Sequence, residues 1–169
     1  VIKKRLIKVG ERFGFIVGGG VVTSLLNEYY SGEERGPKKA AKVVWKLIKT
    51  AILKGEEYER LFPVMKGKFL VQGVEKKFER LTAFIGATVH EIGLGFKVTY
   101  RGDDERGFHF LAAEFSPMQY VMRLHKLYFG LPIKSNLLLV DRVVERVEME
   151  FEKEIFYTID GDMYPLPER

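Results

Sequence analysis

The stretch Phe156-Tyr157-Thr158-Ile159-Asp160-Gly161-Asp162 lies near the carboxyl end of this 169-residue chain. Its aromatic and β-branched residues favour an extended backbone. Gly161 adopts a positive φ at little cost, so the strand is expected to end here with Asp160 at its tip. A carboxylate held at the end of a rigid strand can act as a base. The run therefore predicts a strand and a candidate catalytic residue, with an ordinary solvated Asp-Gly turn as the alternative.

Outside this stretch, short runs rich in Val, Ile and Phe alternate irregularly with longer amphipathic segments. Strands are expected at 12–17, 67–73, 80–88, 94–101, 107–114, 137–149 and 154–159, and helices at 20–31, 37–54, 56–62 and 117–129. The last helix has Ser116 as its cap, Pro117 at its first position and Gly130 just beyond its end. The order predicts an α+β fold, predominantly β: a mostly antiparallel β-sandwich with inserted helices.

Length and composition fit a single domain over residues 1–169, because 46% of the residues are hydrophobic and 30% are charged. The chain has no cysteine, which excludes a disulfide scaffold and is compatible with a cytoplasmic location. No apolar run approaches the roughly 20 residues that cross a bilayer, so any membrane contact is expected to be peripheral. Two Asn and two Gln beside many charged residues resemble the composition of heat-adapted proteins.

Positive charge is concentrated in the first third of the chain. Residues 1–54 hold 12 Lys or Arg against 4 Asp or Glu, whereas residues 55–169 hold 16 against 19. This asymmetry favours an anionic partner, which lipid headgroups, nucleotide phosphates or nucleic acid would all satisfy. Nucleic acid is not expected, because the aromatic residues do not interleave with the basic ones as a base-stacking platform requires.

The expected helix 37–54 carries much of this charge. On a helical wheel its lysines gather on one side, its apolar residues fill the other, and Trp45 lies at the border. Such a helix is attracted to an anionic membrane surface, although it can also pack on a core and leave its lysines in solvent. The candidate membrane or anion contacts are Lys38, Lys42, Lys46, Lys49 and Trp45.

Five segments stand in an order that carries a family resemblance. They are Arg12–Gly20 with its Gly18-Gly19-Gly20 turn, Gly93-Leu94-Gly95-Phe96-Lys97, Gly107-Phe108-His109-Phe110-Leu111, Leu127-Tyr128-Phe129-Gly130 and Asp160-Gly161-Asp162. This order resembles the second, β-rich lobe of the diacylglycerol kinase and sphingosine kinase superfamily, in which the last motif usually reads DGE. The resemblance covers most of the chain.

The resemblance implies phosphoryl transfer from a magnesium nucleotide to a lipid hydroxyl. Asp160 then matches the aspartate thought to take the hydroxyl proton, and Gly161 forms the turn beside it. Asp162 stands where the family has glutamate, so a ligand contact by this shorter side chain does not carry over directly. The apolar residues Met118, Met122, Leu124 and Phe129 are candidates for an acyl-chain cleft or for ordinary core.

The chain lacks the GGDGT-like and GGTxND-like motifs of the family's nucleotide lobe. ATP and Mg²⁺ are therefore expected to be held mainly by a separate N-terminal nucleotide lobe, a partner of this one. The chain begins at Val1 and ends soon after the Asp-Gly-Asp turn, before an expected return strand, which suggests a fragment inactive on its own. The alternative is a non-catalytic lipid- or membrane-binding regulatory module.

Other patterns point to little further chemistry. Gly18-Gly19-Gly20 lacks the third glycine of a dinucleotide turn and the lysine of a Walker loop. His90, His109 and His125 are scattered, so each is expected to be structural or on the surface. The acidic loop Asp103-Asp104-Glu105 offers oxygen ligands, but Arg106 follows where the related kinases have aspartate, and no metal site is expected.

Overall fold

The computed structural model describes residues 5–92, 95–134 and 136–166, which form eleven strands and four helices. The elements in chain order are β1 (Ile7–Val9), β2 (Arg12–Gly14), β3 (Ile16–Gly20), α1 (Val21–Tyr30), α2 (Pro37–Leu53), α3 (Tyr58–Leu61), β4 (Met65–Val71), β5 (Val74–Leu81), β6 (Ala83–Ala87), β7 (Phe108–Ala113), α4 (Pro117–Phe129), β8 (Leu138–Val144), β9 (Val147–Phe151), β10 (Ile155–Ile159) and β11 (Asp162–Leu166).

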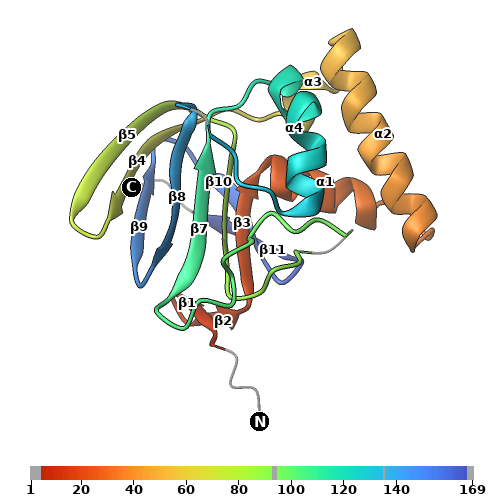
Figure 1. The fold of residues 1–169 in the computed structure, drawn as a ribbon. Coiled ribbons are helices and arrows are strands. Elements are labelled where there is room, and N and C mark those ends of the chain that lie inside the picture. Colours follow the sequence, from red (N-terminus) through yellow and green to blue (C-terminus); the bar gives the residue numbers. More distant parts are fainter. Residues whose placement is uncertain (1–4, 93–94, 135, 167–169) are drawn as a thin grey trace.

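The strands form a six-stranded sheet in the order β11-β10-β3-β6-β7-β8, a three-stranded sheet in the order β5-β4-β9 and a small β1-β2 ladder. Every strand pairing among the described residues is antiparallel. The three-stranded sheet packs on one face of the six-stranded sheet, and the helices lie on the opposite face of the six-stranded sheet (Figure 1). The predicted α+β fold, predominantly β, is confirmed.

Along the central strands, successive side chains point to opposite faces of the six-stranded sheet. On β7, Phe110 and Ala112 belong to the core between the two sheets, whereas Leu111 and Ala113 point to the helices. This follows from the two-residue period of a strand, which sends neighbouring side chains to opposite faces. The sheet is thus buried on both sides, as its nearly continuous apolar strands require.

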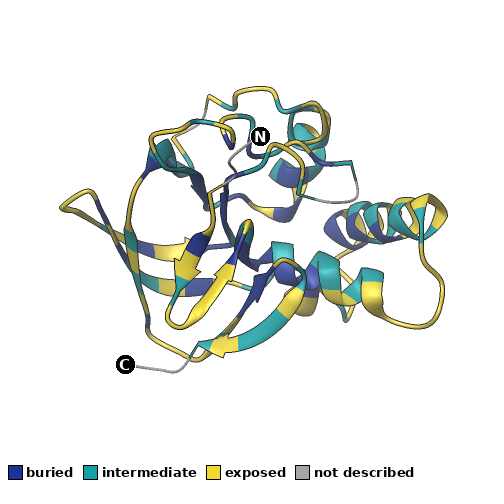
Figure 2. Cartoon of the chain, turned by 90° about the horizontal axis from the view of Figure 1, so that it is seen from below, coloured by how far each residue is buried: buried dark blue, intermediate teal, exposed yellow. Residues whose placement is uncertain are grey.

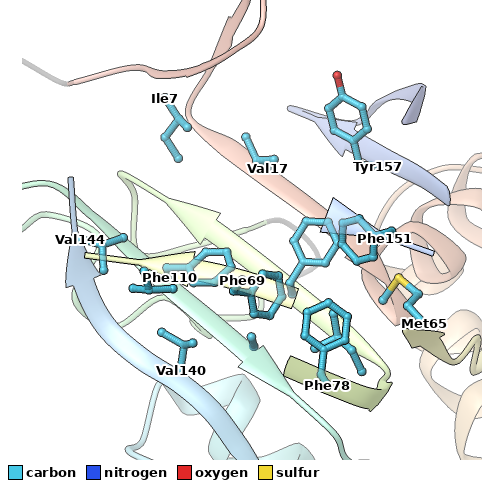
Figure 3. Close-up of a cluster of buried hydrophobic side chains, with 14 of the residues drawn as sticks. Ile7, Val17, Met65, Phe69, Phe78, Phe110, Val140, Val144, Phe151 and Tyr157 are labelled. Atoms are coloured by element: carbon cyan, nitrogen blue, oxygen red, sulfur yellow. The ribbon is translucent and has the colours of Figure 1, made fainter. Parts of the chain in front are cut away.

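The core between the sheets is built from aromatic rings (Figure 3). Phe69 at its centre is fully buried, and its ring centroid lies 4.5 Å from that of Phe78 and 5.5 Å from that of Phe110. Phe84 and Phe151 join the same cluster at 6.5 and 6.4 Å. Offset and edge-to-face pairs of this kind add to the stabilisation from burial alone.

The helical side of the sheet has its own smaller core and a polar anchor. Leu47 of α2 and Phe115 before α4 are buried there. The Tyr120 hydroxyl lies 2.9 Å from Thr82 Oγ1, and that threonine hydroxyl donates to the carbonyl of Phe115. Burial raises the pKa of Tyr120, so this phenol stays protonated. The anchor ties α4 to the junction between β5 and β6.

Local signals predicted the helices well, and the strands less so. The expected helices 37–54 and 117–129 appear as α2 and α4, and the last has the Ser116–Gln119 capping box. The prediction of a strand at 94–101 is wrong for residues 95–101, which form turns and irregular backbone, and Leu94 lies outside the described residues, as does Gly93 of the family-like motif. The expected strand 137–149 is two strands in different sheets, β8 and β9.

Two further corrections concern the glycine triplet and the end of the chain. Gly18, Gly19 and Gly20 form no turn: they are paired residues of β3, and a Cβ on Gly19 would collide with the ring of Phe84 on β6. A return strand is present, since β11 pairs antiparallel with β10 directly after the Asp-Gly turn. The expectation that the chain stops before this strand is therefore wrong.

Candidate functional site

A cavity of about 470 Å³ lies between the six-stranded sheet and the helices. Its walls come from α1, α2 and α4, from strands of the sheet, and from the segment that precedes β7. The lining is largely apolar and includes Leu25, Leu26, Leu47, Ile85, Phe96, Leu111, Leu124 and Leu127. Three charged residues also line it, namely Lys126, Asp141 and Asp160. A concave, mostly apolar space with a few polar groups is the usual form of a site for a small organic ligand.

Asp160 is held firmly at one end of this cavity. The backbone N–H of Ile16 donates to its Oδ1 at 2.8 Å, and the N–H of Phe15 donates to both carboxylate oxygens at 3.0 and 3.1 Å. Its own N–H donates to the carbonyl of Ile16 at 2.9 Å. The residue has φ of 50°, a left-handed conformation that Asp tolerates better than most residues. Asp160 is nevertheless solvent-exposed, so its carboxylate is fixed in place and accessible.

The rest of the predicted turn is also in place. Gly161 has φ of 103°, its N–H donates to Thr158 Oγ1 at 3.2 Å, and it lines the cavity. A Cβ at this glycine would lie 3.2 Å from the Tyr30 hydroxyl of α1, so the turn and the helix approach closely. Asp162 is exposed at the start of β11 and is not part of the cavity wall. The structure thus brings Asp160 and Gly161 to the cavity and leaves Asp162 outside it.

A polar cluster at the cavity wall is absent from the expectations drawn from sequence. His109 on β7 is completely buried, and its Nε2 lies 2.8 Å from Asp141 Oδ1 on β8. The Tyr100 hydroxyl donates to the same carboxylate at 2.8 and 3.0 Å. The N–H of Arg101 donates to His109 Nδ1 at 3.3 Å, which leaves Nε2 to carry the proton of a neutral ring. His109 is structural, as expected, but its partner Asp141 lines the cavity.

The electrostatics of this cluster favour a charged Asp141. Burial by itself would raise the pKa of Asp141, but the hydrogen bonds from His109 and Tyr100 outweigh it, and the pKa is lowered. The pKa of Tyr100 is raised to about 12 by burial and by its bond to the carboxylate. The only sequence signal was an aspartate inside a mainly apolar strand, Leu138–Val144, where Arg142 follows it.

The outer side of the helix α2 carries both exposed lysines and exposed apolar residues, and Figure 2 shows exposed residues on the helices of this layer. Trp45 is 66% exposed and lies within this face, rather than at its border as the wheel predicted. Lys38 and Lys49 are exposed beside it. Lys42 pairs with Glu34 at 2.8 Å, and Lys46 pairs with both Glu28 and Glu57 at 2.8 Å.

These contacts divide the predicted lysines into two groups. The hydrogen bonds that Lys46 donates to Glu28 and Glu57 raise its pKa, and Lys46 belongs with Arg60 to an ion-pair network that joins α1, α2 and α3. Lys46 therefore has a structural role. The outer face of α2 offers Lys38, Lys49 and Trp45 more freely to a partner.

Of the four apolar residues proposed for an acyl-chain cleft, only Leu124 lines the cavity. Met118, Met122 and Phe129 point outward, and Phe129 is 65% exposed. The prediction that they line a cleft or belong to the core is therefore wrong for these three residues. The cavity-facing side of the helix carries Leu124 and Leu127 instead.

Two of the three acidic residues in the loop have partners within the chain. Both carboxylate oxygens of Asp104 accept from the Arg106 guanidinium, at 2.9 and 2.7 Å, and these bonds hold the pKa of Asp104 well below its usual range. Asp103 lies 2.7 Å from His90 Nε2. Within the described residues, no group of three or more His, Asp or Glu side chains is arranged to hold a metal ion. In that same part of the chain, no helix is both long and apolar enough to cross a bilayer.

The fold is similar to that of solved diacylglycerol kinase structures. A diacylglycerol kinase from Bacillus anthracis str. Sterne matches 96% of this chain with a TM-score of 0.56 and 12% sequence identity, over 47% of its own length. The chain has the fold of a lipid-kinase lobe. A second structure from the same organism, to which the diacylglycerol kinase name is given provisionally, matches 96% of this chain with a TM-score of 0.58 and 11% identity, over 52% of its length.

The chain therefore spans about half the length of these kinases. No protein-family model matches its sequence, and no curated protein does. The resemblance inferred from the order of its segments is confirmed at the level of the fold.

Proposed function

We propose that this chain is the substrate-side lobe of a diacylglycerol-kinase-like lipid kinase. The observation that carries the proposal is an apolar cavity of about 470 Å³ with a rigidly held, accessible carboxylate, that of Asp160, at one end. Hydrocarbon gains free energy on entering such a space. A hydroxyl at the end of the hydrocarbon would then lie beside Asp160.

In this proposal Asp160 accepts the proton of the lipid hydroxyl as its oxygen bonds to the transferred phosphorus and the bond to the leaving nucleotide oxygen breaks. The N–H groups of Phe15 and Ile16 fix the carboxylate, so little reorganisation is needed during the reaction. Gly161 keeps the turn narrow beside Tyr30. Asp162 stays a candidate for contact with a ligand that reaches the exposed side of the turn.

ATP and Mg²⁺, which the resemblance implies, are assigned in this proposal to a nucleotide lobe that pairs with this chain. The described residues offer no cluster suited to a metal ion, and β3 uses its three glycines for strand pairing instead of phosphate binding. This chain would contribute lipid binding and the base. Alone, it is expected to transfer no phosphate.

We also infer that α2 approaches an anionic membrane surface. Trp45 and, about two turns further along α2, Leu53 are about two-thirds exposed, and Lys38 and Lys49 are exposed on the same helix. Tryptophan settles at the boundary between headgroups and acyl chains, while lysines are attracted to anionic headgroups. A lobe that takes its substrate from a bilayer needs such a contact.

A non-catalytic lipid-binding module is the second candidate, and one observation favours it. The carboxylate of Asp160 caps the N–H groups of two consecutive residues, which is also what a purely structural aspartate does. In that case the cavity and the α2 face would still bind lipid, and no phosphate would be transferred.

The test is a phosphorylation assay with radiolabelled ATP on mixed vesicles that contain diacylglycerol, a sphingoid base or other hydroxylated lipids. It compares this chain alone with the chain joined to its nucleotide lobe. Label in the lipid only with the joined protein supports the kinase proposal. No label with either, while the chain still sediments with anionic vesicles, would support the binding module.

A further inference from the structure

The far end of the cavity lies across the whole width of the central strands from Asp160. Register pairs Thr158 with Gly18, Gly18 with Ile85, Ile85 with Leu111, and Leu111 with Asp141. This row crosses four strand spacings, which amounts to about 19 Å at roughly 4.8 Å per spacing. All of its members except Gly18 line the cavity.

The cavity therefore follows the row, with a carboxylate near each end. Asp160 stands two residues beyond Thr158, and Asp141 ends the row on β8. The C–C bonds of an extended hydrocarbon are about 1.5 Å long and run in a zigzag that advances about 1.25 Å per bond, so a chain of about fifteen carbons has roughly the length of this row. The apolar residues Ile85 and Leu111 line the space between the two acidic ends.

Asp141 keeps capacity to accept another hydrogen bond. His109 and Tyr100 together supply two hydrogens, while an ionised carboxylate has about four acceptor positions. Its side chain is 21% exposed and lines the cavity, so this capacity is accessible to a bound molecule. A cluster that served only to hold together β7, β8 and the segment before β7 would not need an accessible charge beside apolar walls. A charge in that position carries a desolvation cost.

We propose that the Asp141 end recognises a hydrogen-bond donor, a hydroxyl or an ammonium group, at the remote end of the amphiphile that occupies the cavity. Asp141 is then a specificity-determining residue: it accepts the donor, and His109 and Tyr100 hold the carboxylate in position. The favoured ligand carries polar groups at both ends of a chain of about fifteen carbons. The inference rests on the proposed function only in taking the cavity as the lipid site.

The test uses calorimetric titration of the 169-residue chain with 1-alkanols, α,ω-alkanediols and ω-amino alcohols of eight to sixteen carbons. A second polar group makes the chain less hydrophobic, so a cavity with apolar ends alone prefers the monoalcohol. We expect the diol or the amino alcohol of about fifteen carbons to bind roughly tenfold more tightly than the monoalcohol, because the added bond is made to a charged acceptor. Whichever of the two binds more tightly identifies the donor as hydroxyl or ammonium.

Two variants separate recognition from structure. Asp141→Asn should abolish the preference for the second polar group, whereas Glu145→Gln, which removes an exposed carboxylate just beyond β8 and outside the cavity wall, should keep it. An unchanged preference in Asp141→Asn, or its loss in both variants, would overturn the inference. If Asp141→Asn does not fold, the length series in the native chain decides, because the preference must be absent at eight carbons and appear only when the ligand spans the row.

Outcomes for the inference and for the proposed function are distinct. Equal binding of monoalcohol, diol and amino alcohol at every length would refute recognition by Asp141 and leave the lipid-kinase proposal intact. A clear preference for the second polar group without any phosphoryl transfer in the vesicle assay would support recognition by Asp141 and refute the lipid-kinase proposal. No binding of any alkanol would refute both.

Discussion

The two faces of the six-stranded sheet are packed in different ways. The face toward β4, β5 and β9 is filled by aromatic rings whose centroids lie 4.5–6.5 Å from one another around Phe69. The face toward the helices is less completely filled and holds a cavity of about 470 Å³. Because successive residues of each strand alternate between the faces, the same strands contribute to the aromatic core and to the wall of the cavity. Substitutions on the face toward β4, β5 and β9 should therefore alter stability, and substitutions on the face toward the helices should alter ligand binding or activity.

The largest effect on stability is expected for Phe69→Ala. Phe69 is fully buried and contacts four other rings, so the loss of the ring should lower the free energy of unfolding by about 3–5 kcal/mol. Leu124→Ala on the cavity face is the matched control and should cost less, because its side chain already borders open space. Urea unfolding followed by circular dichroism measures both. Equal losses would mean that the two faces are packed alike.

Asp160→Asn should lower activity and leave stability nearly unchanged, in contrast to Phe69→Ala. In the chain joined to the proposed nucleotide lobe, loss of the proposed base is expected to reduce phosphoryl transfer by about a hundredfold or more. Thermal stability should be nearly unchanged, because an amide oxygen at the Oδ1 position still accepts from Phe15 and Ile16, and Asn tolerates the left-handed backbone.

Asp162→Asn is the control for this experiment, since it removes the same charge from the exposed side of the turn. It should leave the rate far closer to that of the parent. Parent and Asp160→Asn proteins of equal activity would refute the base assignment and favour the binding module.

The helices could be predicted because their signals are local. Ser116, Gln119 and Gly130 stand at fixed positions relative to α4, and the structure uses them as a capping box and a left-handed cap with φ of 67°. The split between β8 and β9 depends instead on distant partners. Residues before Glu145 pair with β7 and residues after Arg146 pair with β4, and nothing within 137–149 encodes these partners.

In the candidate site, too, local signals could be interpreted from the sequence and contacts between distant segments could not. Asp160 could be found because Asp-Gly after a strand is a local signal and because the order of segments resembled a known lobe. Asp141 could not, since its role depends on β8 lying beside β7 and on Tyr100 reaching both from an irregular segment. The outward direction of Met122 and Phe129 was missed for a related reason: a helix that is apolar on two sides does not reveal which side meets the sheet.

Two substitutions that each introduce a larger side chain, one on each face, sharpen the contrast between the faces. Val140→Phe adds a ring to the filled core, where overpacking should cost about 1–3 kcal/mol of unfolding free energy. Leu111→Phe, on the neighbouring strand, adds a ring to the cavity and should change stability by less than about 1 kcal/mol, while it weakens alkanol binding several-fold by occupying the site. Thermal unfolding and calorimetric titration of the two variants provide the comparison. Unimpaired binding in Leu111→Phe would place the ligand elsewhere.

A smaller effect is expected on the outer surface of the helical layer. Replacement of Lys38 and Lys49 by Ala should weaken sedimentation with anionic vesicles by roughly tenfold or more, since each lysine near such a surface contributes about 1 kcal/mol. The control removes two exposed lysines elsewhere, Lys77 and Lys153, and should retain most of the binding. Parallel runs at higher salt should diminish the difference. Equal binding by the two double variants would show that α2 is not the membrane contact.

The smallest effect concerns the pH dependence of the Asp141 cluster on the cavity face. The pKa of Asp141 is lower in the folded chain than its unfolded value of about 3.9, so its ionised form stabilises the fold above that pH. The contribution is lost as the pH falls through the folded pKa. The difference in unfolding free energy between the native chain and Asp141→Asn should therefore be constant from about pH 6 to pH 5 and shrink below about pH 4. Urea titrations at each pH measure it, and a difference that grows in acid would contradict an ionised Asp141 held by His109 and Tyr100.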